Sequence, residues 1–358
     1  MMRVFHLVLA PRLSGAEVLA KDLALDQCAG GMAVCVGSLL PAHDDFASLA
    51  SELQAHGVQC WFPQKRHHAA RKLWNLFVAV RRFRPDVIFA HATIPSFYAR
   101  ALPLGVPVVY VMHSATNDFE RPLFRRIEHL LSGRASVVIG VSQQGVTDYI
   151  QAIGVHPSMT VVPNGVDLAR FAFTDGAQRA ASVPQIVQIG RYASVKNQLL
   201  TVRAFGEVLK QIDDARLVLY GVVEDPDYQR AVVALATELG IAERVVVAGP
   251  RSDVATVLSE SNVFVMPSRS EGHSVAFLEA LASGVPIVAS RIPAFAFANG
   301  FPGVQLVDAD NVSVYADAIV KALSEKRVQR SLAGLTLRDT AERYRAIARQ
   351  VCPAVSAR

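Results

Sequence analysis

The stretch VFVMPSRSEGHSVAFLEALASGVPIVA, residues 263–289, decides the fold class of this chain. It opens with an apolar run, passes through a polar loop into a helical pattern at 274–283, and closes with a second apolar run. Ser274 fits the N-cap of the helix and Gly284 fits its C-terminal end. Strand, helix and strand in this order predict a βαβ unit with two parallel strands.

The same alternation continues in both directions along the chain. The apolar runs are rich in β-branched residues and continuous, which is typical of strands buried on both faces of a parallel sheet. We expect strands at 4–10, 33–37, 87–90, 108–112, 137–141 and 160–162, and again at 185–189, 216–220, 245–248, 263–266, 286–289 and 304–307. Helical patterns lie between them, for example at 15–28, 71–83, 197–211, 228–239 and 274–283.

Because the series occurs twice, the sequence predicts an α/β protein of two doubly wound, Rossmann-like domains with a cleft between them. A length of 358 residues suits two domains. A polar stretch at 174–184 predicts the linker, so we expect an N-terminal domain at 1–168 and a C-terminal domain at 169–340. A last helix follows all the strands, and we expect residues 341–358 to pack back on the first domain.

Composition excludes several classes of protein. A hydrophobic content of 51% excludes a disordered chain. The four cysteines form no CxxC pair, which argues against a disulfide scaffold and a zinc finger. No apolar stretch is long enough to span a bilayer. The run at 4–10 resembles a short signal peptide, but His6 interrupts it, so a buried strand and a cytoplasmic protein are favoured.

Two carboxylates flank the start of the predicted helix at 274–283. Glu271 lies in the preceding loop and Glu279 within the helix, and both can face one side. The amides of His273, Ser274 and Val275 point out of a helix N-terminus, where anions bind. This arrangement suits a ligand with both hydroxyl and phosphate groups. The alternative is a solvated Glu271 and a surface Glu279 paired with an arginine.

Two cations follow the strand expected at 185–189. Gly190 allows a sharp turn, and Arg191 and Lys196 flank a short loop at the carboxyl end of the strand. Such a pair suits a diphosphate. The alternative is two surface cations in a connecting loop.

Three weaker features lie in the first half. Asn164 and Gly165 form a turn signal after a strand. Gly15 follows the first strand and would let a ligand approach a helix N-terminus, although an ordinary loop explains it equally well. His113 ends the strand at 108–112, where it could reach a ligand or serve as a partner of backbone groups. His91 ends an earlier strand in a similar way.

Taken together, these segments resemble a retaining glycosyltransferase of glycosyltransferase family 4, with the GT-B fold. The resemblance extends from about residue 3 to residue 300, in the family's order and at similar spacings. The residues that carry it are Ser14-Gly15-Ala16-Glu17, His113, Val141-Ser142-Gln143, Val162-Pro163-Asn164-Gly165-Val166-Asp167, Gly190-Arg191, Lys196-Asn197 and the block from Glu271 through Glu279 to Pro286.

The resemblance implies a nucleotide-sugar donor bound mainly by the second domain. Arg191 and Lys196 would neutralise the diphosphate, Glu279 would bind the ribose, and Glu271 would contact the sugar. His113 would lie near the anomeric centre. The expected catalytic residues are Glu271, His113, Arg191 and Lys196, and the expected donor-binding residues are Gly15, Asn164, Gly190, Arg191, Lys196, Arg251, Gly272, His273, Ser274, Val275 and Glu279.

The resemblance also implies the reaction. The enzyme would transfer a sugar, most simply from a UDP-sugar, to a hydroxyl acceptor, with retention of configuration and without a metal or other cofactor. Polysaccharide, lipopolysaccharide or glycolipid synthesis would be the setting. A nucleotide-sugar 2-epimerase of the same architecture and a catalytically inactive sugar-nucleotide-binding protein are the alternatives. Ser14 and His273-Ser274 depart from the family pattern, which leaves the donor sugar open.

The basic residues suggest where the acceptor binds. Residues 1–165 carry 15 of the 36 basic residues and 11 of the 31 acidic residues, so most of the net charge of +5 lies there. Arginines and lysines at 65–84 alternate with Trp61, Phe62, Trp74 and Phe77. Such a face could contact the anionic inner surface of the plasma membrane, and the alternative is a solvated helix. Nucleic-acid binding is not expected, because no motif for it is present.

Overall fold

The computed structural model describes residues 1–113, 118–171 and 183–353. The chain forms two compact units, Met1–Gly165 with Gly334–Arg358 and Val166–Ala333. The expected linker at 174–184 lies outside the described residues except for Val183 and Pro184, and residues 354–358 of the expected final helix lie outside them too.

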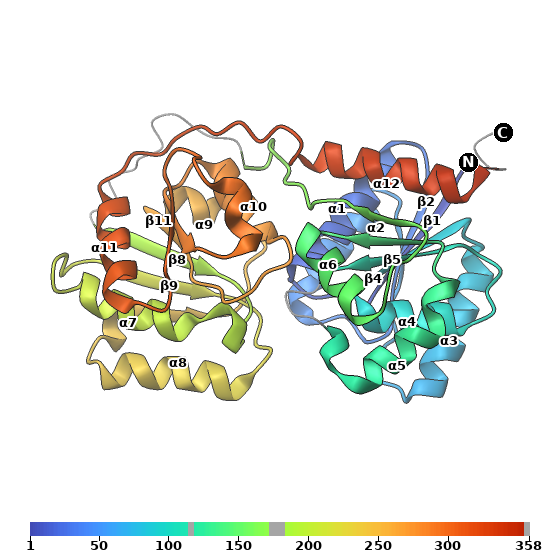
Figure 1. The fold of residues 1–358 in the computed structure, drawn as a ribbon, viewed down its shortest axis with the longest axis horizontal. Helices are drawn as coiled ribbons and strands as arrows, with labels where there is room; N and C mark the ends of the chain where they lie inside the picture. Colours follow the sequence, from blue (N-terminus) through green and yellow to red (C-terminus); the bar gives the residue numbers. More distant parts are fainter. Residues whose placement is uncertain (114–117, 172–182, 354–358) are drawn as a thin grey trace. The chain divides into compact units, whose positions relative to one another are not determined.

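The strands of the first unit are drawn in blue to green in Figure 1. They form a sheet of seven parallel strands in the order β3-β2-β1-β4-β5-β6-β7. The order reverses between β1 and β4, so the switch point of a doubly wound sheet lies between them. The strands are β1 (Arg3–Val8), β2 (Ala33–Ser38), β3 (Gln59–Trp61), β4 (Val87–His91), β5 (Val108–Met112), β6 (Val137–Gly140) and β7 (Met159–Val161).

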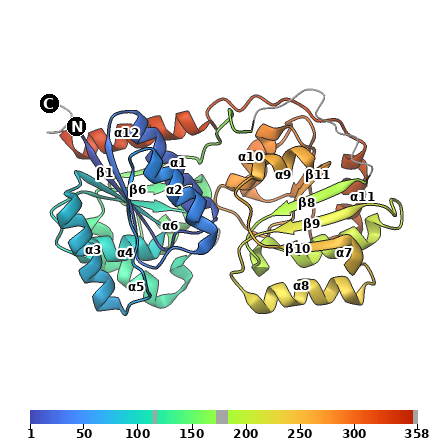
Figure 2. The ribbon, with the colours of Figure 1, turned by 180° about the vertical axis from the view of Figure 1, so that it is seen from behind.

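Helices cover both faces of this sheet (Figure 2). On one face α1 packs against α2 and α12, and on the other α4 packs against α3 and α5. Their bounds are α1 (Gly15–Ala29), α2 (Ala47–Ala55), α3 (Ala69–Phe83), α4 (Thr93–Ala101), α5 (Pro122–Leu131), α6 (Gln143–Ala152) and α12 (Leu337–Val351).

Helix α12 belongs to the first unit although it comes last in the chain. Its residues Tyr344 and Ala348 are buried in one cluster with Phe89 and other strand residues. Thr336 and Asp339 form a capping box at its start. Gly165 lies so close to the carbonyl of Thr336 that a Cβ atom would collide with it. The Asn164-Gly165 turn therefore allows the chain to pack against the start of α12.

The second unit has six parallel strands in the order β10-β9-β8-β11-β12-β13. The order reverses between β8 and β11. The strands are β8 (Gln185–Ile189), β9 (Arg216–Tyr220), β10 (Val245–Ala248), β11 (Val263–Met266), β12 (Ile287–Ser290) and β13 (Val304–Val307). The helices are α7 (Gln198–Val208), α8 (Pro226–Glu238), α9 (Val254–Glu260), α10 (Val275–Ser283) and α11 (Val312–Leu323).

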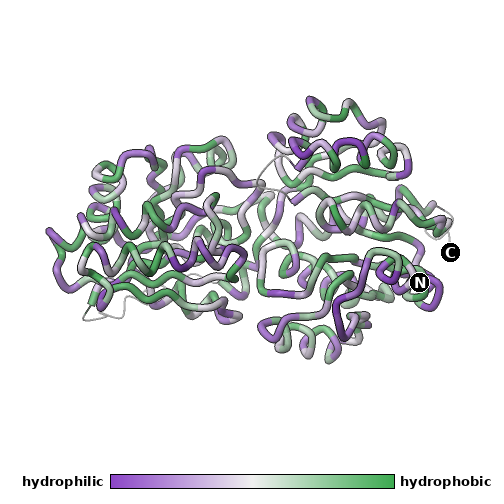
Figure 3. Tube along the Cα trace, turned by 90° about the horizontal axis from the view of Figure 1, so that it is seen from below, coloured by the Kyte–Doolittle hydropathy of each residue, from purple (hydrophilic) through white to green (hydrophobic). Residues whose placement is uncertain are grey.

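The predicted fold class is confirmed: each unit is a doubly wound α/β sheet covered by helices. Every expected strand is present, with small differences at the ends. The run at 4–10 ends as a strand at Val8, and its residues Val4, Phe5 and Leu7 are buried, as a first strand requires. Hydrophobic and hydrophilic segments alternate along each unit, as the sequence pattern indicates (Figure 3). Strand β3 was missed because it has three residues, none fully buried.

Candidate active site

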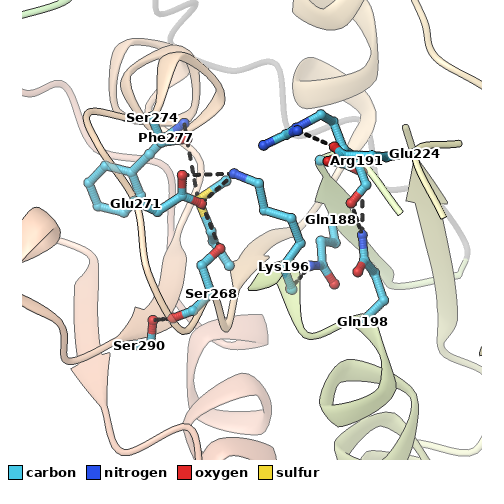
Figure 4. Close-up of polar contacts among 12 residues, drawn as sticks. Gln188, Arg191, Lys196, Gln198, Glu224, Ser268, Glu271, Ser274, Phe277 and Ser290 are labelled. Atoms are coloured by element: carbon cyan, nitrogen blue, oxygen red, sulfur yellow. Dashed lines mark hydrogen bonds and ion pairs between the residues drawn. The ribbon is translucent and has the colours of Figure 1, made fainter. Parts of the chain in front are cut away.

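The switch point of the second sheet brings the two main predicted groups of residues together. The loop after β8 carries Arg191 and Lys196, and the loop after β11 carries Ser268 and Glu271 (Figure 4). Strands β8 and β11 are parallel neighbours, so both loops leave the same edge of the sheet. Open α/β sheets bind their ligands at this place.

Lys196 and Glu271 form a buried ion pair at the centre of this site. The lysine Nζ lies 2.6 Å from Oε1 and 2.7 Å from Oε2 of the carboxylate. The side chains are 11% and 4% exposed. Ser268 donates a further hydrogen bond of 2.7 Å to Oε1. The interpretations of Lys196 as a surface cation and of Glu271 as a solvated carboxylate are therefore wrong.

The backbone of Lys196 is fixed by the strand and helix on either side of it. Gln188 on β8 donates a hydrogen bond of 2.8 Å to the Lys196 carbonyl, and Thr201 on α7 donates one of 2.6 Å to the Gln188 side chain. Asn197 has a left-handed backbone with φ 55°, which turns the chain into α7. Buried hydrogen bonds of this kind give a side chain a defined position.

Helix α10 begins beside Glu271. The Ser274 side chain accepts a hydrogen bond from the Phe277 amide, and Gly284 ends the helix with φ 77°, so the predicted start and end are confirmed. Glu279 on this helix is 7% exposed. Gly272 and Val275 flank the N-terminus, whose backbone amides carry a partial positive charge. The site thus combines the lysine, the carboxylate of Glu271 and a helix N-terminus, and Glu279 is buried on the same helix.

His273 lies at the same helix start and is neutral at physiological pH. Burial lowers its pKa to about 4. Its ring is tilted against Phe297, with ring centres 5.1 Å apart. The position therefore offers a neutral ring and no positive charge.

Arg191 is more exposed than Lys196 and has a different partner. It pairs with Glu224, and the two side chains are 37% and 44% exposed. Glu224 lies after β9, where the chain comes close: a Cβ atom on Gly221 would collide with the carbonyl of Gly190. Glu224 was not predicted, although an acidic residue shortly after the strand at 216–220 was a usable signal.

Arg251 lies after β10, at the same edge of the second sheet. Its Nε donates a hydrogen bond of 2.6 Å to Asp253, and its guanidinium lies 5.7 Å from the centre of the Tyr220 ring. The side chain is 47% exposed, so Arg251 lies on the surface of the second unit and is held there by the carboxylate of Asp253.

The other predicted residues belong to the first unit. Gly15 is the first residue of α1, directly after Ser14, whose hydroxyl contacts Glu17. Asn164 is 4% exposed beside the start of α12. His113 follows β5, and its Nε2 lies 2.9 Å from Nδ1 of His91. The structure therefore places His91 and His113, which both end predicted strands, in direct contact.

The basic and aromatic segment of the first unit includes α3. Leu76, Val80 and Phe83 face the core, whereas Trp74 is 56% exposed and its ring centre lies 5.9 Å from that of Phe77. The guanidinium of Arg81 lies 5.5 Å from the centre of the Phe77 ring. Aromatic and basic groups thus share the exposed side of this helix.

The described residues hold neither a candidate metal cluster nor a candidate membrane-spanning helix. No group of three or more His, Cys, Asp or Glu residues in the described part of the chain could hold a metal ion. In the same residues, no helix has the length and apolar character needed to cross a bilayer.

Two family descriptions match this chain. Residues 13–170 match "Glycosyltransferase Family 4" and residues 183–325 match "Glycosyl transferases group 1". Among solved structures, Anabaena Alr3699/HepE in complex with UDP-glucose has a TM-score of 0.78 at 19% identity and covers all of both chains. A sucrose-phosphate synthase from Thermosynechococcus elongatus has a TM-score of 0.80 at 16% identity, covering 99% of this chain and 100% of that one. These likenesses show the GT-B fold.

Curated relatives are similar over part of their length. The UDP-Gal:alpha-D-GlcNAc-diphosphoundecaprenol alpha-1,3-galactosyltransferase of Escherichia coli is 25% identical over 282 residues, 72% of this chain and 71% of that protein. The D-inositol 3-phosphate glycosyltransferase of Segniliparus rotundus is 28% identical over 69% of this chain and 56% of its own length. A GDP-mannose-dependent alpha-(1-6)-phosphatidylinositol monomannoside mannosyltransferase of Mycolicibacterium smegmatis is 29% identical over 48% of each.

The chain thus spans only about half the length of several relatives, but the family matches fall on both units and follow the same order along the chain. Every relative named above is a glycosyltransferase or shares the fold of one. The chain therefore belongs to glycosyltransferase family 4 and is a glycosyltransferase with the GT-B fold.

Proposed function

We propose that this protein transfers a sugar from a UDP-sugar to a hydroxyl acceptor in the synthesis of a cell-surface polysaccharide, lipopolysaccharide or glycolipid, with retention of configuration and without a metal. The observation that carries the proposal is the buried Lys196–Glu271 pair beside the capped start of α10. Burying an ion pair costs desolvation free energy, and this pair lies where open α/β sheets bind their ligands.

The Lys196–Glu271 pair suits a ligand with a phosphate end and a hydroxyl end. In the free protein the carboxylate of Glu271 provides the negative charge that Lys196 needs. A diphosphate would bring its own negative charge to the lysine and to the amides at the start of α10. Glu271 would then accept hydrogen bonds from the sugar hydroxyls while Ser268 keeps it in place.

The same groups would stabilise the leaving nucleoside diphosphate. Its negative charge increases as the glycosidic bond breaks, and Lys196 and the helix amides are already positioned before the reaction starts. Arg191 would add a second cation, and Glu279 would bind the ribose. In the first unit, we propose Gly15, Asn164 and His113 as the donor-binding residues. The acceptor would attack from the face that the diphosphate leaves, and a phosphate oxygen would take its proton.

The choice of UDP rests on relatives alone. The Escherichia coli relative uses UDP-Gal by its name, and HepE was solved with UDP-glucose. The Mycolicibacterium smegmatis relative is named for GDP-mannose. A thermal-shift panel of UDP, GDP, ADP and dTDP therefore comes first, followed by turnover of the matching nucleotide sugars. We expect UDP to stabilise the protein most and a chelator to leave turnover unchanged.

Lys196→Met tests the site itself. We expect this variant to lose the nucleotide-induced shift and to lower turnover on the order of a hundredfold, because the leaving group loses a charged partner. Lys210→Met is the matched control, since Lys210 is 69% exposed and pairs with Glu207 on the surface. Near-normal turnover by Lys196→Met would overturn the assignment, and conversion of the donor to an epimer without any acceptor would point to an epimerase.

The acceptor is proposed to be carried at an anionic membrane surface on the cytoplasmic side. The exposed Trp74 and the arginines of α3 support this, because aromatic and basic groups bind the interface of such membranes. We expect the protein to sediment with vesicles that contain phosphatidylglycerol and not with phosphatidylcholine vesicles. Trp74→Ser should weaken sedimentation, whereas Val246→Ser, at a residue 50% exposed in the second unit, should not.

A further inference from the structure

Three histidines and a glutamine form a continuous hydrogen-bond chain in the first unit. Gln27 Oε1 lies 2.9 Å from His6 Nε2, His6 Nδ1 lies 2.9 Å from His91 Nε2, and His91 Nδ1 lies 2.9 Å from His113 Nε2. Gln27 is on α1, and the histidines come from the adjacent strands β1 and β4 and from the residue after β5. This chain of hydrogen bonds therefore runs across the switch point of the first sheet.

The geometry of the rings is that of in-plane hydrogen bonds. The ring centres are 5.2 Å apart in both histidine pairs, although the bonded nitrogens are 2.9 Å apart, and the planes differ by 28° and 21°. The rings therefore meet edge to edge. Aromatic rings lie beside two of them: Phe89 stacks on His6 with ring centres 5.4 Å apart, and Tyr344 lies parallel to His91 with ring centres 6.5 Å apart.

All three rings are neutral at physiological pH. Burial lowers the pKa of His6 and of His113 to about 4 and holds the pKa of His91 well below its usual value. A neutral imidazole has one N–H donor and one acceptor nitrogen. In a row of such rings each one must donate in the same direction, so the group at the end of the row decides the direction for all.

Gln27 is that end group, and its carbonyl oxygen can only accept. His6 therefore donates from Nε2 to Gln27, His91 donates from Nε2 to His6, and His113 donates from Nε2 to His91. This leaves Nδ1 of His113 as an acceptor. We propose that Gln27, His6 and His91 are positioning residues that hold His113 in the Nε2–H form, so that its Nδ1 accepts a hydrogen bond from a hydroxyl of the bound donor sugar.

The part of this inference that concerns the sugar rests on the proposed function, but the direction of the chain does not. If the Gln27 amide turned over, its NH2 group would donate to His6, every bond would reverse, and His113 would present an N–H at Nδ1. An N–H would favour a hydroxyl or ether oxygen that accepts. The Gln27 amide, which is separated from the ligand by three histidines, thus selects between two kinds of sugar contact.

Nitrogen-15 NMR of histidine-labelled full-length protein tests the direction without any ligand. We expect the His113 signals to show a protonated Nε2 and an unprotonated Nδ1, with the assignment made from the signals lost in His113→Gln. Gln27→Glu should keep this pattern, because a carboxylate also accepts. Gln27→Met should convert His113 to a mixture of the two forms. A protonated Nδ1 in the unchanged protein, or an unaltered pattern in Gln27→Met, would overturn the inference.

Kinetics then separate positioning from folding. With the nucleotide sugar that the protein turns over, Gln27→Met should lower kcat/KM on the order of tenfold, and Gln27→Glu should restore most of it. Affinity for UDP alone should stay unchanged in both, since UDP lacks the transferred donor sugar that would contact His113. Gln54→Met on the exposed face of α2 is the control. Loss of UDP binding in Gln27→Met would show a structural role instead, and inactivity of the unchanged protein would reject the proposed function while leaving the NMR result in force.

Discussion

The two units have the same arrangement of strands at their switch points but different chemistry there. In the second unit, β8 and β11 hold a buried lysine and carboxylate. In the first unit, β1 and β4 hold His6 and His91, which are buried and neutral. The shared topology explains why both sites lie at the carboxyl ends of strands. The side chains decide what each can bind: a charged site suits a diphosphate, and a neutral, directional site suits a hydroxyl.

Breaking the Lys196–Glu271 ion pair of the second unit should give the largest effect, and a double variant separates its effect on stability from its effect on turnover. Lys196→Met leaves the buried carboxylate of Glu271 without its cation, which should lower the free energy of unfolding by about 3–5 kcal/mol. Adding Glu271→Gln removes that charge, so the double variant should recover most of the stability and none of the turnover. Urea denaturation and an activity assay measure the two quantities.

Recovery of turnover in the double variant would contradict a direct role for Lys196. Failure to recover stability would mean that the ion pair is not what holds this loop. Lys210→Met again serves as the control, because exposed ion pairs contribute less than about 1 kcal/mol.

Acid should weaken the neutral site of the first unit. Unfolding raises the pKa of His6 from about 4 to its ordinary 6.5, so only the unfolded chain takes up a proton between these values. Stability is therefore complete above pH 6.5, falls as the pH drops toward 4 and levels off below it, and His6 alone should account for about 2 kcal/mol between pH 6.5 and pH 5.

Tryptophan fluorescence can follow this loss in the first unit, because the two tryptophans, Trp61 and Trp74, both belong to it. Circular dichroism follows both units. His273 gives an effect of the same sign in the second unit, but one such ring should matter less than three. Replacing His6 and Gln27 together by leucine should make the fluorescence transition less sensitive to pH, and an unchanged sensitivity would show that these rings are not the cause.

The sequence predicted the fold, and it predicted Lys196, Glu271 and His113 as site residues without predicting their contacts. Continuous β-branched runs marked the strands because both faces of a parallel sheet are buried. Ser274 and Gly284 marked α10 because caps are local. The Lys196–Glu271 contact joins residues 75 positions apart, and His6 meets His91 over 85 positions. Strand order brings these pairs together, and no local pattern encodes it.

Substitutions of Arg191 and Glu224 should give the smallest effect. They test whether a charge at the switch point of the second sheet must be buried to contribute strongly to UDP binding. The pair is more than one-third exposed, so water and salt screen it, and Glu224→Gln should change the free energy of unfolding by less than about 1 kcal/mol. The same change releases Arg191 from its carboxylate. We expect a several-fold gain in UDP affinity that fades as salt is raised, since exposed charges are screened at the ionic strength of a cell.

Arg191→Gln should weaken UDP binding by a similar factor, far less than Lys196→Met. Isothermal titration at low and high salt measures both variants. If Arg191→Gln lowered affinity as much as Lys196→Met, burial would not be what distinguishes the two cations, and the contrast between them would have to come from their distance to the phosphates.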